Sequence, residues 1–139
     1  MGGLLLSLLN ILLSSLMLWI LPESLSQEQS VLLILDQANT PLKMFLVFIQ
    51  LLILAPLGEE LLFRAFLYPA LLKRLKIWPA ILLSSLIFAA LHLNLAAFLP
   101  LFIGGLGFNI IYARWGNLLY CAVAHAIWNG VSLLVYFLS

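Results

Sequence analysis

Five long apolar runs constrain the fold of this chain more than any other feature. They cover residues 3–22, 43–72, 78–98, 100–114 and 117–138. The hydrocarbon core of a bilayer is about 30 Å thick, and each crossing helix needs about 20 consecutive apolar residues. Backbone polar groups in lipid must also be satisfied within their own segment, which favours helices. We therefore predict an all-α polytopic transmembrane bundle of about five helices.

The composition supports a membrane protein and excludes several other classes. The chain is 65% hydrophobic and 8% charged, with a mean hydropathy of +1.22. A soluble domain of 139 residues needs far more polar surface than this. The net charge of +1 and the single short basic tract at residues 73–76 exclude nucleic acid as a partner. The one cysteine, Cys121, excludes an intrachain disulfide bond.

The runs divide one membrane domain, residues 1–139, into three parts. The run 3–22 is too long for a cleaved signal peptide and lacks its basic start, so we interpret it as the first span. Residues 22–42 form the one sizeable loop, and residues 43–138 form a core of about four spans.

Two features inside the core predict its local geometry. The second span is too long for one straight crossing, and Pro56 and Pro69 are expected to kink it. The fourth span is short, and three glycines on it predict close packing against a neighbouring helix. These are Gly104, Gly105 and Gly107.

The distribution of charge predicts the orientation. The loops after the second and fourth spans carry the basic residues Lys73, Arg74, Lys76 and Arg114. The 22–42 loop instead carries Glu23, Glu28 and Asp36. The positive-inside rule places the amino terminus and the basic loops in the cytoplasm, and the 22–42 loop on the other side. We therefore expect a multi-pass protein of the lipid bilayer with a cytoplasmic amino terminus.

The stretch PLGEELLFR, residues 56–64, places three charged side chains in the second span. A charge inside hydrocarbon is costly unless it is paired or lines a wet cavity. Glu60 and Arg64 are four residues apart, so they share a helix face and can form an ion pair. Glu59 is rotated from Glu60 by about 100°, so its carboxylate must point elsewhere.

Other polar side chains lie in the later spans. They are His92 and Asn94 in the third, Asn109 in the fourth, and His125 and Asn129 in the fifth. Counted at about 1.5 Å per residue from the cytoplasmic ends, the glutamates and both histidines reach overlapping depths. One shared cluster costs less than several isolated buried polar groups. The sequence therefore predicts that three helices contribute to one polar site.

Several simpler roles stay open for these residues. Glu60 and Arg64 can form a purely structural ion pair. A single histidine can bond a backbone carbonyl or bind a haem or a pigment. The amides of Asn94 and Asn109 fit hydrogen bonds between helices better than catalysis.

The set as a whole fits water activation best. A carboxylate and an imidazole can deprotonate a water molecule, and a second imidazole with a nearby amide can stabilise an oxyanion. Cys121 lies four residues before His125 and is an alternative nucleophile, but this leaves Glu59 and His92 without a role. Glu59, His92 and His125 together are also a chemically acceptable zinc ligand set.

Three motifs occur in order along the chain. They are Glu59-Glu60-x-x-x-Arg64, Phe88-x-x-x-His92 and His125-x-x-x-Asn129. Together they resemble the CPBP (CAAX protease and bacteriocin-processing, or Abi) family of intramembrane endopeptidases, which includes the type II CAAX prenyl endopeptidases. The resemblance covers about residues 50 to 132. It departs from the family in its small number of spans and in Ala65, where many members have glycine.

The resemblance implies a role for each motif residue. It assigns Glu59 and His92 to water activation, and His125 and Asn129 to an oxyanion hole. The supporting residues are Glu60, Arg64 and Phe88. It implies no cofactor and favours a metal-independent mechanism over zinc.

The resemblance also implies the kind of partner. The expected partner is a membrane-embedded or membrane-anchored peptide substrate, cleaved near the cytoplasmic face. The alternative is a non-catalytic subunit that stabilises a larger membrane complex through its glycine-rich fourth span.

Overall fold

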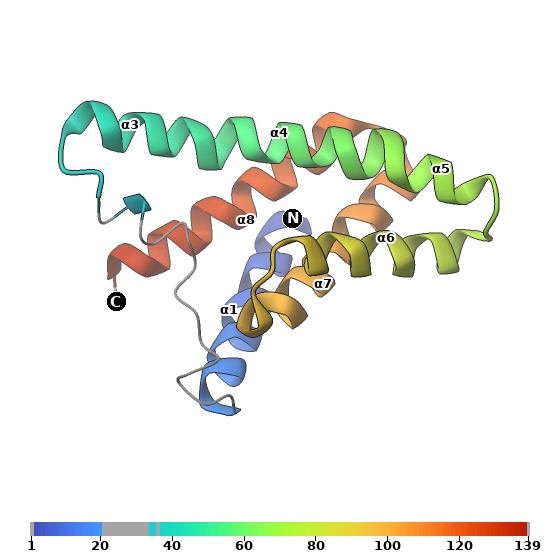
Figure 1. Ribbon diagram of the computed structural model, residues 1–139, viewed down its shortest axis with the longest axis horizontal. Helices are drawn as coiled ribbons and strands as arrows, with labels where there is room; N and C mark the ends of the chain where they lie inside the picture. The colour runs from blue at the N-terminus through green and yellow to red at the C-terminus, as the bar shows by residue number, and fades with distance from the viewer. Residues whose placement is uncertain (1, 21–33, 36, 139) are drawn as a thin grey trace.

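The computed structural model describes residues 2–20, 34–35 and 37–138, and every regular element within them is helical (Figure 1). The elements are α1 (Gly2–Ile20), α3 (Pro41–Ile49), η2 (Gln50–Leu54), α4 (Ala55–Glu60), η3 (Leu61–Leu67), α5 (Tyr68–Leu72), α6 (Ile77–Leu91), α7 (Leu95–Trp115) and α8 (Leu118–Leu138). The segments from α3 to α5 follow one another without a break and form one long helix, residues 41–72. The described chain thus contains five helices, which confirms the predicted all-α bundle.

Three of these helices are long and apolar enough to cross a membrane. They are Pro41–Leu72, Leu95–Trp115 and Leu118–Leu138, and the apolar helix α6 is shorter. Many large apolar side chains on them face outward, including Phe66 and Leu134. A soluble protein would bury such residues, whereas a bilayer solvates them. The chain is therefore an integral membrane protein.

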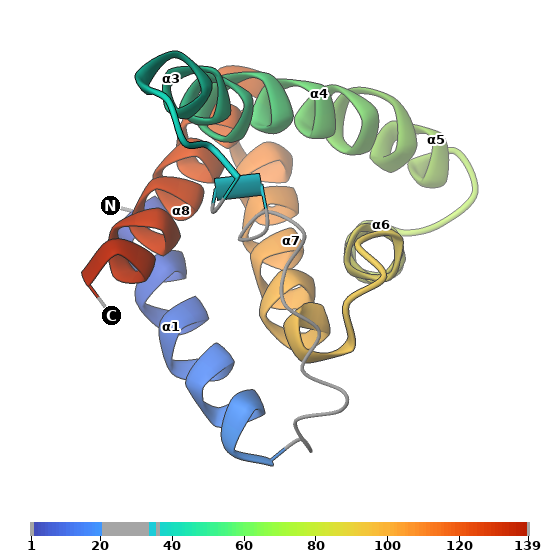
Figure 2. The same cartoon turned by 60° about the vertical axis from the view of Figure 1, so that its left-hand side comes forward.

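Helix α7 is central in the bundle and packs against α6, α1 and α8, and the long helix lies across one end of this group (Figures 1 and 2). After α5 the chain turns at residues 73–76, and α6 runs back alongside the long helix. Helix α7 packs extensively on α6, and α1 packs against both α7 and α8. Helix α8 contacts η2, α4 and η3, so it faces the middle of the long helix.

The long helix begins at Pro41, and each of its two internal prolines follows a π-helical segment. Pro56 comes directly after η2 and Ala55, and Pro69 follows η3 and Tyr68. A proline ring clashes with the carbonyl four residues earlier and removes one N–H donor. The residue before each proline bonds instead to the carbonyl five residues earlier: Ala55 N to Gln50 O, and Tyr68 N to Phe63 O. The effect of the prolines, predicted as kinks, is thus seen as a wider π-helical turn before each of them.

The predicted boundary between the third and fourth spans was wrong. The expected third span, 78–98, ends at Leu91, and α7 begins at Leu95 rather than at residue 100. Leu93 has a left-handed backbone with φ 51°, which stops α6. Asn94 then caps α7, because its side-chain oxygen accepts from Ala97 N at 2.9 Å. Helix α7 is therefore 21 residues long and is not short.

The glycines of α7 allow close packing, as predicted. A Cβ atom at Gly104 would meet the Trp128 ring of α8 at 2.9 Å. At Gly105 it would lie 3.3 Å from the Ser85 backbone of α6. Gly107 faces Leu6 of α1 in the same way. Each glycine thus faces a different neighbouring helix.

Two other predictions stay largely untested. Most of the 22–42 loop lies outside the described residues, which include only 34, 35 and 37–42 of it. The orientation of the bundle in the membrane stays a prediction, because no bilayer accompanies the chain.

Candidate active site

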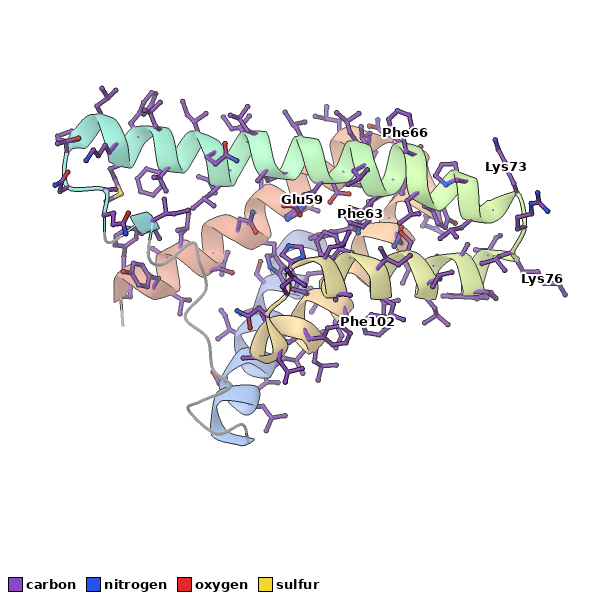
Figure 3. All side chains as sticks on the ribbon, viewed as in Figure 1. Glu59, Phe63, Phe66, Lys73, Lys76 and Phe102 are labelled. Atoms are coloured by element: carbon purple, nitrogen blue, oxygen red, sulfur yellow. The ribbon has the colours of Figure 1, made fainter. Side chains whose placement is uncertain are left out.

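The charged motif of the second span lies near the middle of the long helix, where α4 passes into η3 (Figure 3). Glu60 and Arg64 are fully buried, and Arg64 is among the largest fully buried side chains. Arg64 Nη1 donates to Glu60 Oε1 at 3.1 Å, as the four-residue spacing predicted. Each of the two buried charges thus neutralises the other, which offsets part of the cost of removing both from water.

Arg64 also ties the long helix to α7. Its Nη2 donates to the backbone oxygen of Gly105 at 3.1 Å. The guanidinium lies over the rings of three phenylalanines, at 5.0 Å for Phe88, 5.3 Å for Phe108 and 5.7 Å for Phe63. Aromatic faces at this range attract a cation. Arg64 therefore anchors three helices at one point.

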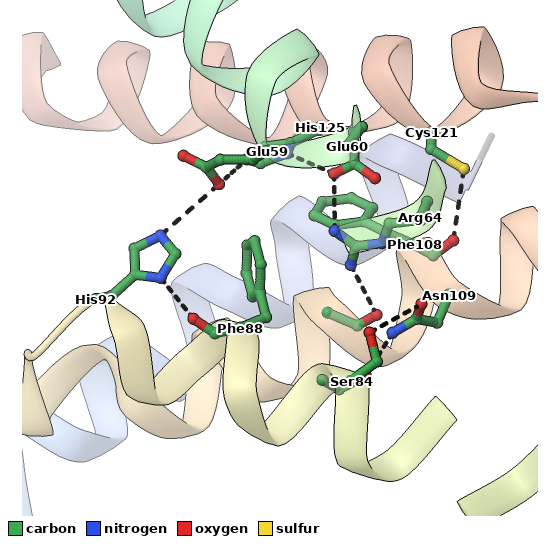
Figure 4. A network of polar contacts seen from close by, with 12 residues as sticks. Glu59, Glu60, Arg64, Ser84, Phe88, His92, Phe108, Asn109, Cys121 and His125 are labelled. Carbon is green, nitrogen blue, oxygen red and sulfur yellow. Dashed lines mark hydrogen bonds and ion pairs between the residues drawn. The ribbon is translucent and has the colours of Figure 1, made fainter. Parts of the chain in front are cut away.

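Glu60 has a second partner that spacing did not predict. Its Oε1 also accepts from His125 Nδ1 of α8 at 2.8 Å (Figure 4). A carboxylate only accepts hydrogen bonds, so the proton of this bond lies on Nδ1. The imidazole stacks on the Phe108 ring with a centroid distance of 4.7 Å. These contacts fix the ring orientation and direct Nε2 away from Glu60.

Glu59 lies between the two histidines. Its Oε2 is 3.7 Å from His125 Nε2 and 3.8 Å from His92 Nε2. The Glu59 side chain is 31% exposed and that of His92 is 32% exposed, although Glu59 Oε2 itself is buried, whereas the whole of Glu60 is buried. The predicted rotation between the adjacent glutamates thus separates one fully buried side chain from one partly exposed side chain.

His92 owes its position to the end of α6. It is the residue that caps this helix, and its Nδ1 lies 2.8 Å from the carbonyl oxygen of Phe88. A carbonyl oxygen accepts, so Nδ1 carries the proton and Nε2 has a free lone pair in the neutral ring. Phe88 itself is buried and packs edge-on against Phe63 at 5.0 Å. Within the Phe88-x-x-x-His92 motif, the Phe88 backbone thus holds the His92 ring in its place beside Glu59.

Asn129 lies one turn after His125 on α8 but has another contact. Its amide nitrogen donates to the backbone oxygen of Leu51 in η2 at 2.9 Å. Leu51 O lies four residues before Ala55 N, which bonds instead to Gln50 O in the π-helical turn. Asn129 therefore binds a carbonyl that the widened turn leaves available. The structure brings Glu59, His92 and His125 together, whereas the contact seen for Asn129 is with the backbone of η2.

A second buried polar group lies between α6 and α7. Asn109 Nδ2 donates to Ser85 Oγ at 2.9 Å, and Ser84 Oγ lies 3.5 Å from Asn109 Oδ1. Asn109 thus bonds between helices, as its sequence context indicated. The serines were not expected to take part, although their adjacency at the small-residue face of a span was a usable signal. Cys121 bonds the backbone oxygen of Phe108 at 3.5 Å and turns away from the site.

The fit of a metal to this site can be tested on the donor atoms. Glu59, His92 and His125 converge, but no group of three or more His, Cys, Asp or Glu side chains within the described ranges is arranged to hold a metal ion. The described donor set therefore does not fit a zinc ion.

Comparison with known proteins identifies a family. The model of the type II CAAX prenyl endopeptidase Rce1-like family matches residues 41–131, which contain all three motifs. Neither the comparison with curated proteins nor that with solved structures gave a match. The match favours a protease-type membrane enzyme over a non-catalytic subunit. It also agrees with the resemblance of the motifs, and the chain belongs to the Rce1-like family of type II CAAX prenyl endopeptidases.

Proposed function

We propose that this chain is an intramembrane endopeptidase that hydrolyses a peptide bond with a water molecule activated by Glu59 and His92. The observation that supports this most directly is the position of Glu59. Its Oε2 is buried and lies within 3.8 Å of two imidazole Nε2 atoms from two other helices, whereas the Glu59 side chain as a whole is 31% exposed. A carboxylate beside an imidazole with a free lone pair is a suitable general base.

The reaction uses these groups in two steps. The water gives one proton to Glu59, with His92 Nε2 accepting its second hydrogen bond, and its oxygen adds to the peptide carbonyl carbon. The C–N bond of the tetrahedral intermediate then breaks, and the proton held by Glu59 passes to the leaving amine. The products are a carboxylic acid and an amine, so water is the only co-reactant.

His125 and Asn129 are assigned to the oxyanion. His125 Nδ1–H is used by Glu60, so donation from Nε2 requires the imidazolium form, whose charge the Glu60 carboxylate at 2.8 Å compensates. Asn129 has two amide hydrogens, and the bond to Leu51 O uses one of them. The second hydrogen remains for the oxyanion. Glu60 and Arg64 are positioning residues that hold His125 and the long helix.

The membrane setting defines the proposed substrate. Glu59 lies in the middle of a span of 32 residues, so the peptide must reach it within or beside the bilayer. We assign the substrate to membrane-embedded or membrane-anchored peptides, and the opening of the site to the cytoplasmic face. A role within a larger membrane complex is compatible with this activity.

The test compares wild type with Glu59→Gln and His92→Gln in native membranes, by proteomics of new peptide ends. Both changes keep the size and polarity of the side chain, so the variants should insert at wild-type abundance. We expect product ends that vanish in both variants. Unchanged product ends, with the variants stably inserted, would refute the proposed mechanism.

A further inference from the structure

A groove on the outer face of α6 plays no part in the proposed reaction. It has a volume of about 380 Å³, and its lining is formed by Leu75, Pro79, Leu82, Leu83, Leu86 and Phe102. Five of these belong to α6 or the turn before it, and Phe102 comes from α7. Leu82 and Leu86 are 49% and 46% exposed, so the groove opens outward. Figure 3 shows Phe102 on the side of α6 away from the long helix.

One end of the groove lies beside the basic turn. Lys73, Arg74 and Lys76 are all exposed, and the groove residue Leu75 lies between the last two in sequence. Lys73 and Lys76 project from the turn in Figure 3. Within the part of the chain that the structure describes, every ion pair involves Glu59 or Glu60, so none of these three cations is neutralised by a carboxylate.

The length of the groove fits one leaflet. From Leu75 to Leu86 it extends over eleven residues, or roughly 16 Å at about 1.5 Å per residue. This is about half of the 30 Å hydrocarbon core of a bilayer. Trp78, 66% exposed, lies near its basic end, where an aromatic ring is expected at the interface with water. These features fit an occupant with an anionic head and an apolar tail about one leaflet long.

We propose that this groove binds one acyl chain of an anionic phospholipid, whose phosphate is held by Lys73, Arg74 and Lys76. Basic pockets between transmembrane helices bind anionic headgroups in this way, and each cation near the surface contributes about fivefold in affinity. The combination of a charged end and an open apolar groove distinguishes this site from general attraction to an anionic surface. The inference does not depend on the proposed proteolysis.

Native mass spectrometry of the detergent-purified protein tests the headgroup contacts. The probes are phosphatidylglycerol and phosphatidylcholine with the same acyl chains. We expect wild type to retain one phosphatidylglycerol in preference to phosphatidylcholine. The variant Lys73→Gln/Arg74→Gln/Lys76→Gln should lose this preference by about fivefold per cation removed. Lys43→Gln, which removes an exposed cation remote from the groove, is the matched control and should keep the preference.

A second variant tests the groove itself. Leu86→Trp should fill it and reduce retention of both lipids, although the basic turn is unchanged. Leu134→Trp changes another outward leucine, on α8, and should leave retention as in wild type. Equal retention of the two lipids by wild type would overturn the proposal. The proposal would also be overturned if wild type retained no lipid and formed a dimer that Leu86→Trp breaks. A second copy of the chain would then cover the groove.

Discussion

Replacing Glu60 with glutamine tests whether the buried carboxylate has both a structural and a positioning role. Glu60→Gln keeps the side-chain volume but leaves Arg64, fully buried, without its counter-charge. At 3.1 Å and an effective dielectric constant of about 20, the lost attraction is about 5 kcal/mol. The bond to Gly105 O and the three phenylalanine rings still compensate part of the charge. We therefore expect the free energy of unfolding to fall by about 3 kcal/mol, at the lower end for a broken buried pair.

A double-mutant cycle separates the two roles. Arg64→Met removes the cation, so Glu60→Gln/Arg64→Met should be more stable than the sum of the single losses predicts, because no uncompensated charge remains. Activity should not recover, since His125 still lacks the carboxylate that holds its Nδ1–H. Loss of such an orienting carboxylate lowers the rate by up to about 10⁴-fold in a serine protease.

The cycle needs two measurements on the same samples. Thermal or denaturant unfolding in detergent gives the four stabilities, and release of the peptide product identified in native membranes gives the four rates. Additive stability losses would contradict the buried pair. Wild-type activity in the double variant would show that Glu60 does not position His125, even if the pair is structural.

Three further predictions concern packing, backbone and metal. Gly105→Ala should lower the free energy of unfolding by about 1–3 kcal/mol, because its Cβ would lie 3.3 Å from the Ser85 backbone. The control Gly58→Ala has nothing within 4 Å of its new Cβ and should be neutral or stabilising. Equal unfolding midpoints for the two variants would contradict the close approach of α6 and α7. Leu93→Gly places a glycine at a left-handed backbone position with φ 51°, where glycine is unstrained. It should therefore cost less stability than Leu91→Gly, which weakens the end of α6 by about 1 kcal/mol. The reverse order of melting temperatures would show that Leu93 is unstrained. Proteolysis should persist after dialysis against a strong zinc chelator, and loss of activity that added zinc restores would refute the metal-independent proposal.

The sequence predicted that Glu59, His92 and His125 would share one polar site, but not how these side chains are held. Charges and imidazoles in apolar spans can be found from composition, and their depths follow from the helical rise. The contact of Glu60 with His125 could not be predicted, because it depends on the relative rotation of the long helix and α8. The end of α6 at Leu91 was missed for a similar reason. No glycine or proline marks it, and the turn depends on an unfavourable Leu93 conformation and an asparagine cap.

The two adjacent glutamates meet two opposite requirements that a membrane site places on its carboxylates. A carboxylate that acts as a base must meet water, whereas one that orients an imidazole must be dry and compensated. Helical geometry turns Glu59 and Glu60 about 100° apart, so one sequence position separates the two environments. Glu60 is fully buried beside Arg64 and His125, whereas Glu59 is partly exposed beside His92 at the end of α6. Exchanging the two proposed roles would require rotating the long helix, and the bond from Arg64 to Gly105 O opposes that rotation.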